Sequence, residues 1–154
     1  MELPKRISRP ITLGDAAVEG LIYGIVAGLG MALFVVAFEW LAGVMPLEVL
    51  TYFGATADVS PWVGLFTHAA VSGIYGVIFG MLALAVARMF GHRMNQGVWL
   101  TLGIVYGLLI FAVAKGVILP RTASPLDDLP VWALGIAHAL YGFILAWFVG
   151  RKTQ

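Results

Sequence analysis

The 154-residue chain contains no cysteine, so it can form neither a disulfide nor a thiolate metal site, and it has no cysteine nucleophile. Charged residues make up only 11% of the chain, whereas soluble domains contain about 25%. The formal net charge is +1, and a protein with so little positive charge is not expected to bind nucleic acid.

Sequence signatures of enzymes are also missing. The chain contains no HExxH, GxSxG, P-loop or dinucleotide-binding pattern. The segments between its apolar runs are too short to form a soluble catalytic domain. We therefore expect a protein that is not an enzyme, with no catalytic residues and no dedicated metal site.

Long hydrophobic runs are what the chain does contain, and 61% of its residues are hydrophobic. A helix that spans a bilayer needs roughly 20 apolar residues, and continuous rather than alternating runs exclude barrel strands. The sequence predicts an all-α integral membrane protein, a four-transmembrane-helix bundle in a single domain of residues 1–154. The expected spans are about 16–44, 62–87, 97–119 and 131–149, and they follow an N-terminal segment of residues 1–15.

The basic residues predict the orientation of the spans. Lys and Arg are enriched in the cytoplasmic segments of membrane proteins. Only Arg121 lies in a loop on the opposite side from the other basic loop and terminal residues. We expect a multi-pass protein of the inner membrane, with both termini and residues 1–15 in the cytoplasm. The residues on the cytoplasmic side are Lys5, Arg6, Arg9, Arg88, Arg93, Arg151 and Lys152.

Several residues mark the ends of the predicted helices. Thr12 and Asp15 have the spacing of a capping box that opens the first helix. Proline cannot continue a helix but fits its first turn. We therefore expect Pro46 and Pro120 to end the first and third helices, and Pro61 and Pro130 to begin the second and fourth.

The two halves of the chain resemble each other. The segments DVSPW (58–62) and DLPVW (128–132) lead into the second and fourth spans. A histidine follows the proline of each segment, His68 after seven residues and His138 after eight. This internal repeat predicts two tandem helical hairpins, related by an axis along the membrane normal.

Glycine follows four of the five tyrosines, once in each span. Small residues four apart let helix backbones approach closely in lipid, where packing must supply the association. The tyrosine beside each glycine can cover a neighbouring groove and donate its hydroxyl to a facing carbonyl. The alternative is that the tyrosines line a site for a pigment, quinone or lipid. The expected packing residues are Gly24, Gly28, Gly76, Gly80, Gly107, Gly142, Tyr23, Tyr75, Tyr106 and Tyr141.

Each span also carries one ionisable residue at a similar depth: Glu39, His68, Lys115 and His138. An ionisable group within a span is by default a candidate functional residue. We expect these four to form a polar layer near the outer surface. The layer fits three roles: a structural Glu39–Lys115 ion pair with histidine hydrogen bonds, binding of haem b by His68 and His138 or of a metal shared with Glu39, or a proton relay or small-ion site.

These observations leave three functions open. The first is a non-catalytic accessory subunit of a larger membrane complex of the respiratory or photosynthetic type. The second is an electron-transfer protein that binds haem b or a metal through His68 and His138. The third is a small oligomeric transporter or proton-coupled channel. The expected partners are membrane lipid and other membrane-protein subunits or further copies of the chain.

Overall fold

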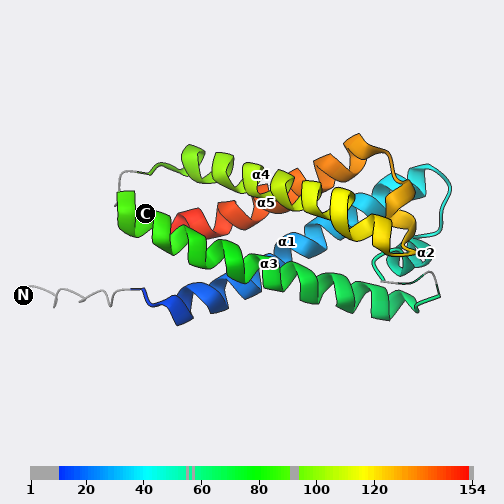
Figure 1. Cartoon of the computed structure of the whole chain (residues 1–154), viewed down its shortest axis with the longest axis horizontal. Coiled ribbons are helices and arrows are strands. Elements are labelled where there is room, and N and C mark those ends of the chain that lie inside the picture. The colour runs from blue at the N-terminus through cyan, green and yellow to red at the C-terminus, as the bar shows by residue number, and fades with distance from the viewer. Residues whose placement is uncertain (1–10, 55, 57, 91–93, 153–154) are drawn as a thin grey trace, which may run out of the picture.

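The computed structural model describes residues 11–54, 56, 58–90 and 94–152, and this part of the chain is helical without any strand. Four long helices run along the molecule (Figure 1). They are α1 (Leu13–Leu41), α3 (Pro61–Phe90), α4 (Gln96–Val113) and α5 (Val131–Lys152). A short helix, α2 (Pro46–Thr51), follows α1, and three shorter turns follow α4: the π-helical turn η2 (Ala114–Ile118) and the 3-10 turns η3 (Leu119–Arg121) and η4 (Pro125–Asp128).

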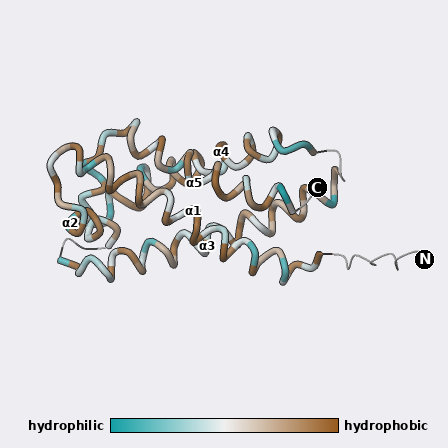
Figure 2. The backbone as a smooth tube through the Cα atoms, turned by 180° about the vertical axis from the view of Figure 1, so that it is seen from behind, coloured by the Kyte–Doolittle hydropathy of each residue, from teal (hydrophilic) through white to brown (hydrophobic). Residues whose placement is uncertain are grey.

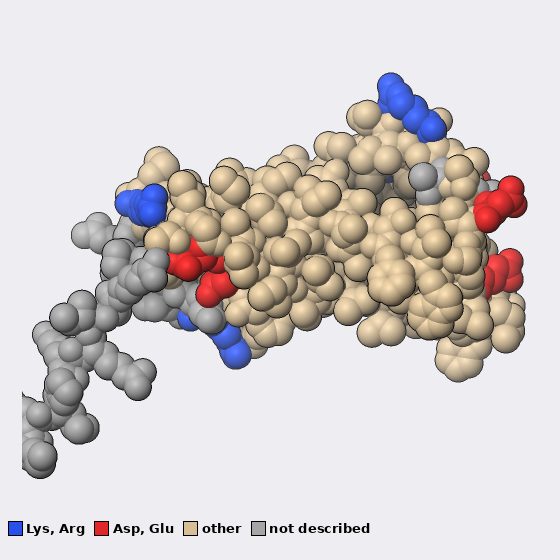
Figure 3. Space-filling model, turned by 90° about the horizontal axis from the view of Figure 1, so that it is seen from below, with Lys and Arg blue, Asp and Glu red and all other residues tan. Residues whose placement is uncertain are grey.

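The expected all-α four-helix bundle is confirmed, and all four long helices are long and apolar enough to cross a membrane. Hydrophobic residues recur along each of them (Figure 2). On the face shown in Figure 3, the charged side chains gather at the two ends of the molecule and the middle carries none. This distribution fits a multi-pass membrane protein, because only an apolar belt is stable against lipid tails.

The helix boundaries differ from those expected at two places. The first helix ends at Leu41 rather than near residue 44, because Gly43 adopts a positive φ of 94° that reverses the chain. Pro46 therefore does not end α1 but occupies the first turn of α2. The third span is not one regular helix to residue 119, since α4 stops at Val113 and continues as η2.

The predicted capping box at the start of α1 is confirmed. The Thr12 hydroxyl accepts a hydrogen bond from the Asp15 backbone N–H at 3.1 Å. The Asp15 carboxylate accepts one in return from the Thr12 backbone N–H at 2.9 Å. Two backbone donors at the helix start are thereby satisfied.

The four long helices form two hairpins. α1 packs along α3 in one hairpin and α4 packs along α5 in the other, and the contact of α1 with α5 joins them (Figure 1). Helices α1 and α5 are therefore the central pair of the bundle, and α3 and α4 flank them. Helix α2 and the turns η3 and η4 lie together at one end of the bundle, here called the loop end.

Glycine lies where the two helices of each hairpin come closest. A methyl group added at Gly24 of α1 would lie 2.6 Å from the carbonyl oxygen of Ser72 and 2.7 Å from the Cα atom of Gly76, both in α3. A methyl group added at Gly142 of α5 would lie 2.7 Å from the carbonyl carbon of Gly103 in α4. Real Cβ atoms do not come so close to backbone, so these contacts require glycine.

Two of the tyrosines join helices through their hydroxyl groups. Tyr106 of α4 donates to the Tyr75 carbonyl of α3 at 2.7 Å, and Tyr141 of α5 donates to the Ser72 carbonyl of α3 at 2.7 Å. The ring of Tyr23 stacks on Phe148 instead, with 5.0 Å between their centroids. The second hairpin is thus hydrogen-bonded to α3 near the middle of the bundle.

Candidate ligand-binding site

A cavity of about 240 Å³ lies between the two hairpins towards the loop end. Helix α3 contributes His68 and Ser72 to its wall, and α5 contributes His138 and Tyr141. Most of the remaining wall comes from apolar side chains of α1, α4, η2 and the loop-end segments. The two histidines, seventy positions apart in the sequence, therefore meet in one cavity.

The π-helical turn η2 forms one wall of this cavity, through Ala114 and Ile118. Pro120 has no N–H, and in a regular α-helix its ring would clash with the carbonyl of Gly116. A π-turn is one way to relieve such a clash, and turns of this kind are frequent at functional sites. Gly116 and Pro120 indicate a break in this span, but the sequence does not show that the break is a π-helical turn.

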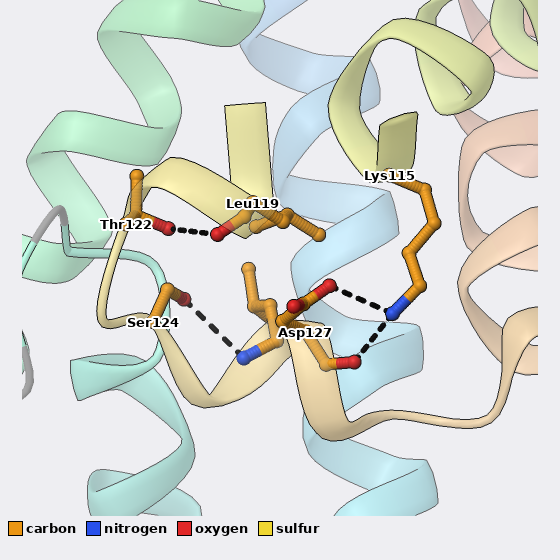
Figure 4. Close-up of polar contacts among 6 residues, drawn as sticks. Lys115, Leu119, Thr122, Ser124 and Asp127 are labelled. Carbon is orange, nitrogen blue, oxygen red and sulfur yellow. Dashed lines mark hydrogen bonds and ion pairs between the residues drawn. The ribbon is translucent and has the colours of Figure 1, made fainter. Parts of the chain in front are cut away.

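Polar contacts hold the loop-end segments together, and Figure 4 shows those made by Lys115, Thr122 and Ser124. The Lys115 ammonium lies 2.7 Å from the Asp127 carboxylate and also donates to the Asp127 carbonyl. The Ser124 hydroxyl donates to the carbonyl of Tyr52 at the end of α2. These contacts tie η2, η4 and α2 to one another.

Each histidine donates one ring N–H to a backbone carbonyl. His68 donates from Nε2 to Gly28 of α1 at 3.0 Å, and His138 donates from Nδ1 to Leu134 one turn earlier in α5 at 2.9 Å. A carbonyl oxygen only accepts, so the proton position is fixed on each ring. In the neutral form, which an apolar cavity favours, His68 Nδ1 and His138 Nε2 are left as bare hydrogen-bond acceptors.

These two acceptor nitrogens are not sealed inside the protein. Among the described residues, only Trp99 Nε1 is a fully enclosed side-chain polar atom without a hydrogen-bond partner. Both histidines line the same cavity, so the cavity presents two acceptors to whatever occupies it.

The other two residues of the expected polar layer lie outside this cavity's wall. Lys115 pairs with Asp127, so the Glu39–Lys115 ion pair expected from the sequence is not formed in the described structure. Glu39 lies near α2, where burial, the Glu48 carboxylate and then the Glu39 carboxylate raise the pKa of Tyr52. Of the four residues, the structure brings together only His68 and His138.

The arrangement of the histidines does not favour haem. If His68 Nε2 were to bind a haem iron, it would have to give up its hydrogen bond to the Gly28 carbonyl. The cavity of about 240 Å³ is also smaller than the roughly 300–1,000 Å³ of drug-sized ligand sites, and haem is a large ligand. For metals, no cluster of three or more His, Asp or Glu side chains suited to an ion occurs in the described part of the chain.

Sequence reasoning missed Asp127, Ser124 and Ser72 as parts of this region. The sequence places Asp127 in a polar loop, and only the structure shows that its carboxylate pairs with Lys115. Ser72 belongs to the small-residue steps of the second span, but its exposure to the cavity follows from the packing of α5. No local sequence pattern predicts the ion pair of Asp127 or the position of Ser72 in the cavity wall.

Comparison of the chain with models of protein families, with characterised proteins and with solved structures gave no match. The described chain is a small helical bundle of two hairpins around a histidine-lined cavity, and its four long helices are long and apolar enough to cross a membrane.

Proposed function

We propose that this chain is a non-catalytic membrane protein that binds a lipophilic molecule through a hydrogen-bond-donating head group. The observation that carries the proposal is the pair of bare imidazole nitrogens, His68 Nδ1 and His138 Nε2, in a mostly apolar cavity. An acceptor that faces an apolar cavity without a donor is costly, so such a pair favours a ligand that supplies the donors.

The cavity wall supports entry from the lipid. Val71 of α3 and Ile118 of η2 both line the cavity, yet they are 44% and 42% exposed at the surface of the bundle. Side chains that face both the cavity and the surface mark an opening between α3 and the end of the third span. In the membrane this opening faces lipid tails, and a lipophilic ligand can enter there while its tail stays outside.

The size of the cavity supports a head group rather than a whole lipid. A cavity of about 150 Å³ accepts a benzene molecule, and this one measures about 240 Å³. A substituted ring or a small polar head group fits that volume. A long tail does not, and it would extend through the opening.

We keep the accessory-subunit role as the setting in which such binding would operate. Helix α4 buries only Trp99, Gly103 and Gly107, so most of its surface is apolar and faces outward. Lipid or a neighbouring subunit of a respiratory or photosynthetic complex would cover that surface. The sequence bias of basic residues supports an inner-membrane location with both termini in the cytoplasm.

The proposed internal repeat is consistent with this site. Each hairpin packs through glycines, and each second helix contributes one histidine to the shared cavity, His68 from α3 and His138 from α5. Glycines such as Gly24 and Gly142 make their close contacts within the chain. They therefore give no separate support for a surface that binds another subunit.

The transporter alternative gains less support. Beyond the cavity, towards the chain termini, the described bundle is filled by buried apolar side chains such as Phe79 and Leu145. Tyr106 packs against Phe79 with 5.0 Å between the ring centroids. A pathway through one copy of the chain would have to cross this packed region.

Photolabelling tests the proposed function. The purified protein in nanodiscs is irradiated with an aliphatic alcohol that carries a diazirine, and the labelled residues are mapped by mass spectrometry. We expect label on cavity residues such as Ile110 and Tyr75, and its loss in Ala114→Phe, which fills the cavity. The matched control is Val113→Phe, because Val113 is 46% exposed and is not part of the cavity wall.

Two results would contradict the proposal. One is label spread evenly over lipid-facing positions such as Ile74 and Leu109, which are both exposed. The other is cavity labelling that Ala114→Phe leaves unchanged while the protein remains folded.

A further inference from the structure

The hydrogen bonds of the two histidines restrict the head group that a ligand of this cavity can carry, an inference that rests on the proposed function. Both histidines have committed their only proton to a backbone carbonyl, at Gly28 and at Leu134. Neither ring can therefore donate to a ligand without losing an existing hydrogen bond. A ligand that satisfies both rings must donate twice.

The hydroxyl groups of the wall do not discriminate in this way. Tyr141 donates to Ser72, and Ser124 donates to Tyr52. The hydroxyls of Tyr52, Thr67, Ser72 and Tyr75 can rotate, so they can serve as donor or as acceptor. Selection between ligands by hydrogen bonding therefore depends mainly on the two imidazoles.

The lining and volume of the cavity favour an aromatic ring. Aromatic side chains from three segments contribute to the wall, including Phe53, Tyr75 and Tyr141. Phe53 already packs on the His68 ring, with 4.4 Å between their centroids. Offset contacts between aromatic rings are favourable, and the volume of about 240 Å³ exceeds the roughly 150 Å³ that accepts benzene.

We propose that the ligand is a lipophilic quinol, a dihydroxy aromatic ring with an apolar tail, bound in preference to its quinone. The two ring hydroxyls donate to His68 Nδ1 and His138 Nε2, and the tail leaves between α3 and η2. A quinone carries carbonyl oxygens in place of these hydroxyls, so it would leave both nitrogens unpaired beside further acceptors. A site that requires a donor rejects the analogue that lacks one.

The test compares ligands that differ only in their donors. A decyl-tailed benzoquinol, the matching quinone, the quinol dimethyl ether and a phenol with one hydroxyl are titrated anaerobically into the purified protein, with intrinsic tryptophan fluorescence as the readout. We expect the quinol to bind at least tenfold more tightly than the quinone or the dimethyl ether, with the phenol in between. Tenfold preference for the reduced form raises the midpoint potential of the bound couple by about 30 mV.

A substitution of His138 tests whether this histidine is responsible for the preference for the quinol. His138→Phe keeps an aromatic ring and gives up only a hydrogen bond within α5, so we expect it to fold and to lose about tenfold in quinol affinity. Its quinone affinity should not fall, because a quinone has no hydroxyl group to donate to His138 Nε2. Val113→Phe, outside the cavity, should change neither affinity.

Three outcomes would overturn this inference. They are equal affinity for quinol and quinone, a phenol that binds as tightly as the quinol, and a quinol preference that survives in folded His138→Phe. If none of the ring compounds binds but the diazirine alcohol still labels the cavity, the quinol assignment fails and the proposed function stands. If neither binds, both fail.

Discussion

The close contact at Gly142 gives the sharpest prediction about stability. Replacing Gly142 with alanine adds one methyl group at a position where it would lie 2.7 Å from the Gly103 carbonyl carbon and 3.1 Å from the Gly107 nitrogen. These are backbone atoms, so they cannot rotate away as a side chain could. The helices α4 and α5 must separate to accommodate the methyl group.

The expected cost follows from two opposing effects. Alanine is favoured over glycine within a helix by about 0.5–1 kcal/mol, whereas an extra carbon in a well-packed interface costs about 1–3 kcal/mol. Gly135 is the matched control, because it lies in the same helix α5 and a methyl group added there meets only ring atoms of Phe111, at 3.9 Å or more. Gly135→Ala should therefore show the helix effect alone, and Gly142→Ala should be less stable than that control by about 1–3 kcal/mol.

The assay is reversible unfolding by sodium dodecyl sulfate in mixed micelles, followed by far-ultraviolet circular dichroism. The free energy of unfolding is compared among the wild-type protein, Gly142→Ala and Gly135→Ala. If both variants unfold at the same detergent fraction, then α4 and α5 do not meet at Gly142 as described. The packing of the second hairpin would then be wrong.

Three further predictions concern single contacts. Tyr141→Phe removes the hydrogen bond to Ser72, and we expect it to lower the free energy of unfolding by about 0.5–1.5 kcal/mol; an unchanged value would show that the bond is not formed. A double-mutant cycle of Lys115→Met and Asp127→Asn should give a coupling of about 1 kcal/mol that weakens in salt, and additive effects would contradict the ion pair. Thr12→Ala removes the cap of α1, with an expected loss of about 0.5–2 kcal/mol and faster amide exchange at Asp15.

The spans and the start of α1 could be predicted because their signals are local. Hydrophobic length alone marks four helices, and Thr12 and Asp15 form their capping box within one turn. The two tandem hairpins were predicted from the similar segments 58–62 and 128–132, and α1 does pack along α3 and α4 along α5. Pro46 was misplaced because its effect depends on Gly43, whose positive φ had already ended α1.

The site was predicted only in part. His68 and His138 stood out as polar residues in apolar spans, and they do share a cavity. Equal depth along each span was not enough to place Glu39 and Lys115 there, because side-chain direction depends on helix rotation. The π-helical turn η2 alters that rotation at Lys115, and its partner Asp127 lies in a loop without a recognisable pattern.

The most direct test of the central claim is ¹⁵N nuclear magnetic resonance of the histidine rings in the purified protein. The account predicts neutral rings with opposite tautomers: a proton on Nε2 of His68 and on Nδ1 of His138. The bare nitrogens, His68 Nδ1 and His138 Nε2, should both shift when the decyl-tailed quinol is added. The same tautomer on both rings, or bare nitrogens that do not respond to any lipophilic donor, would contradict it.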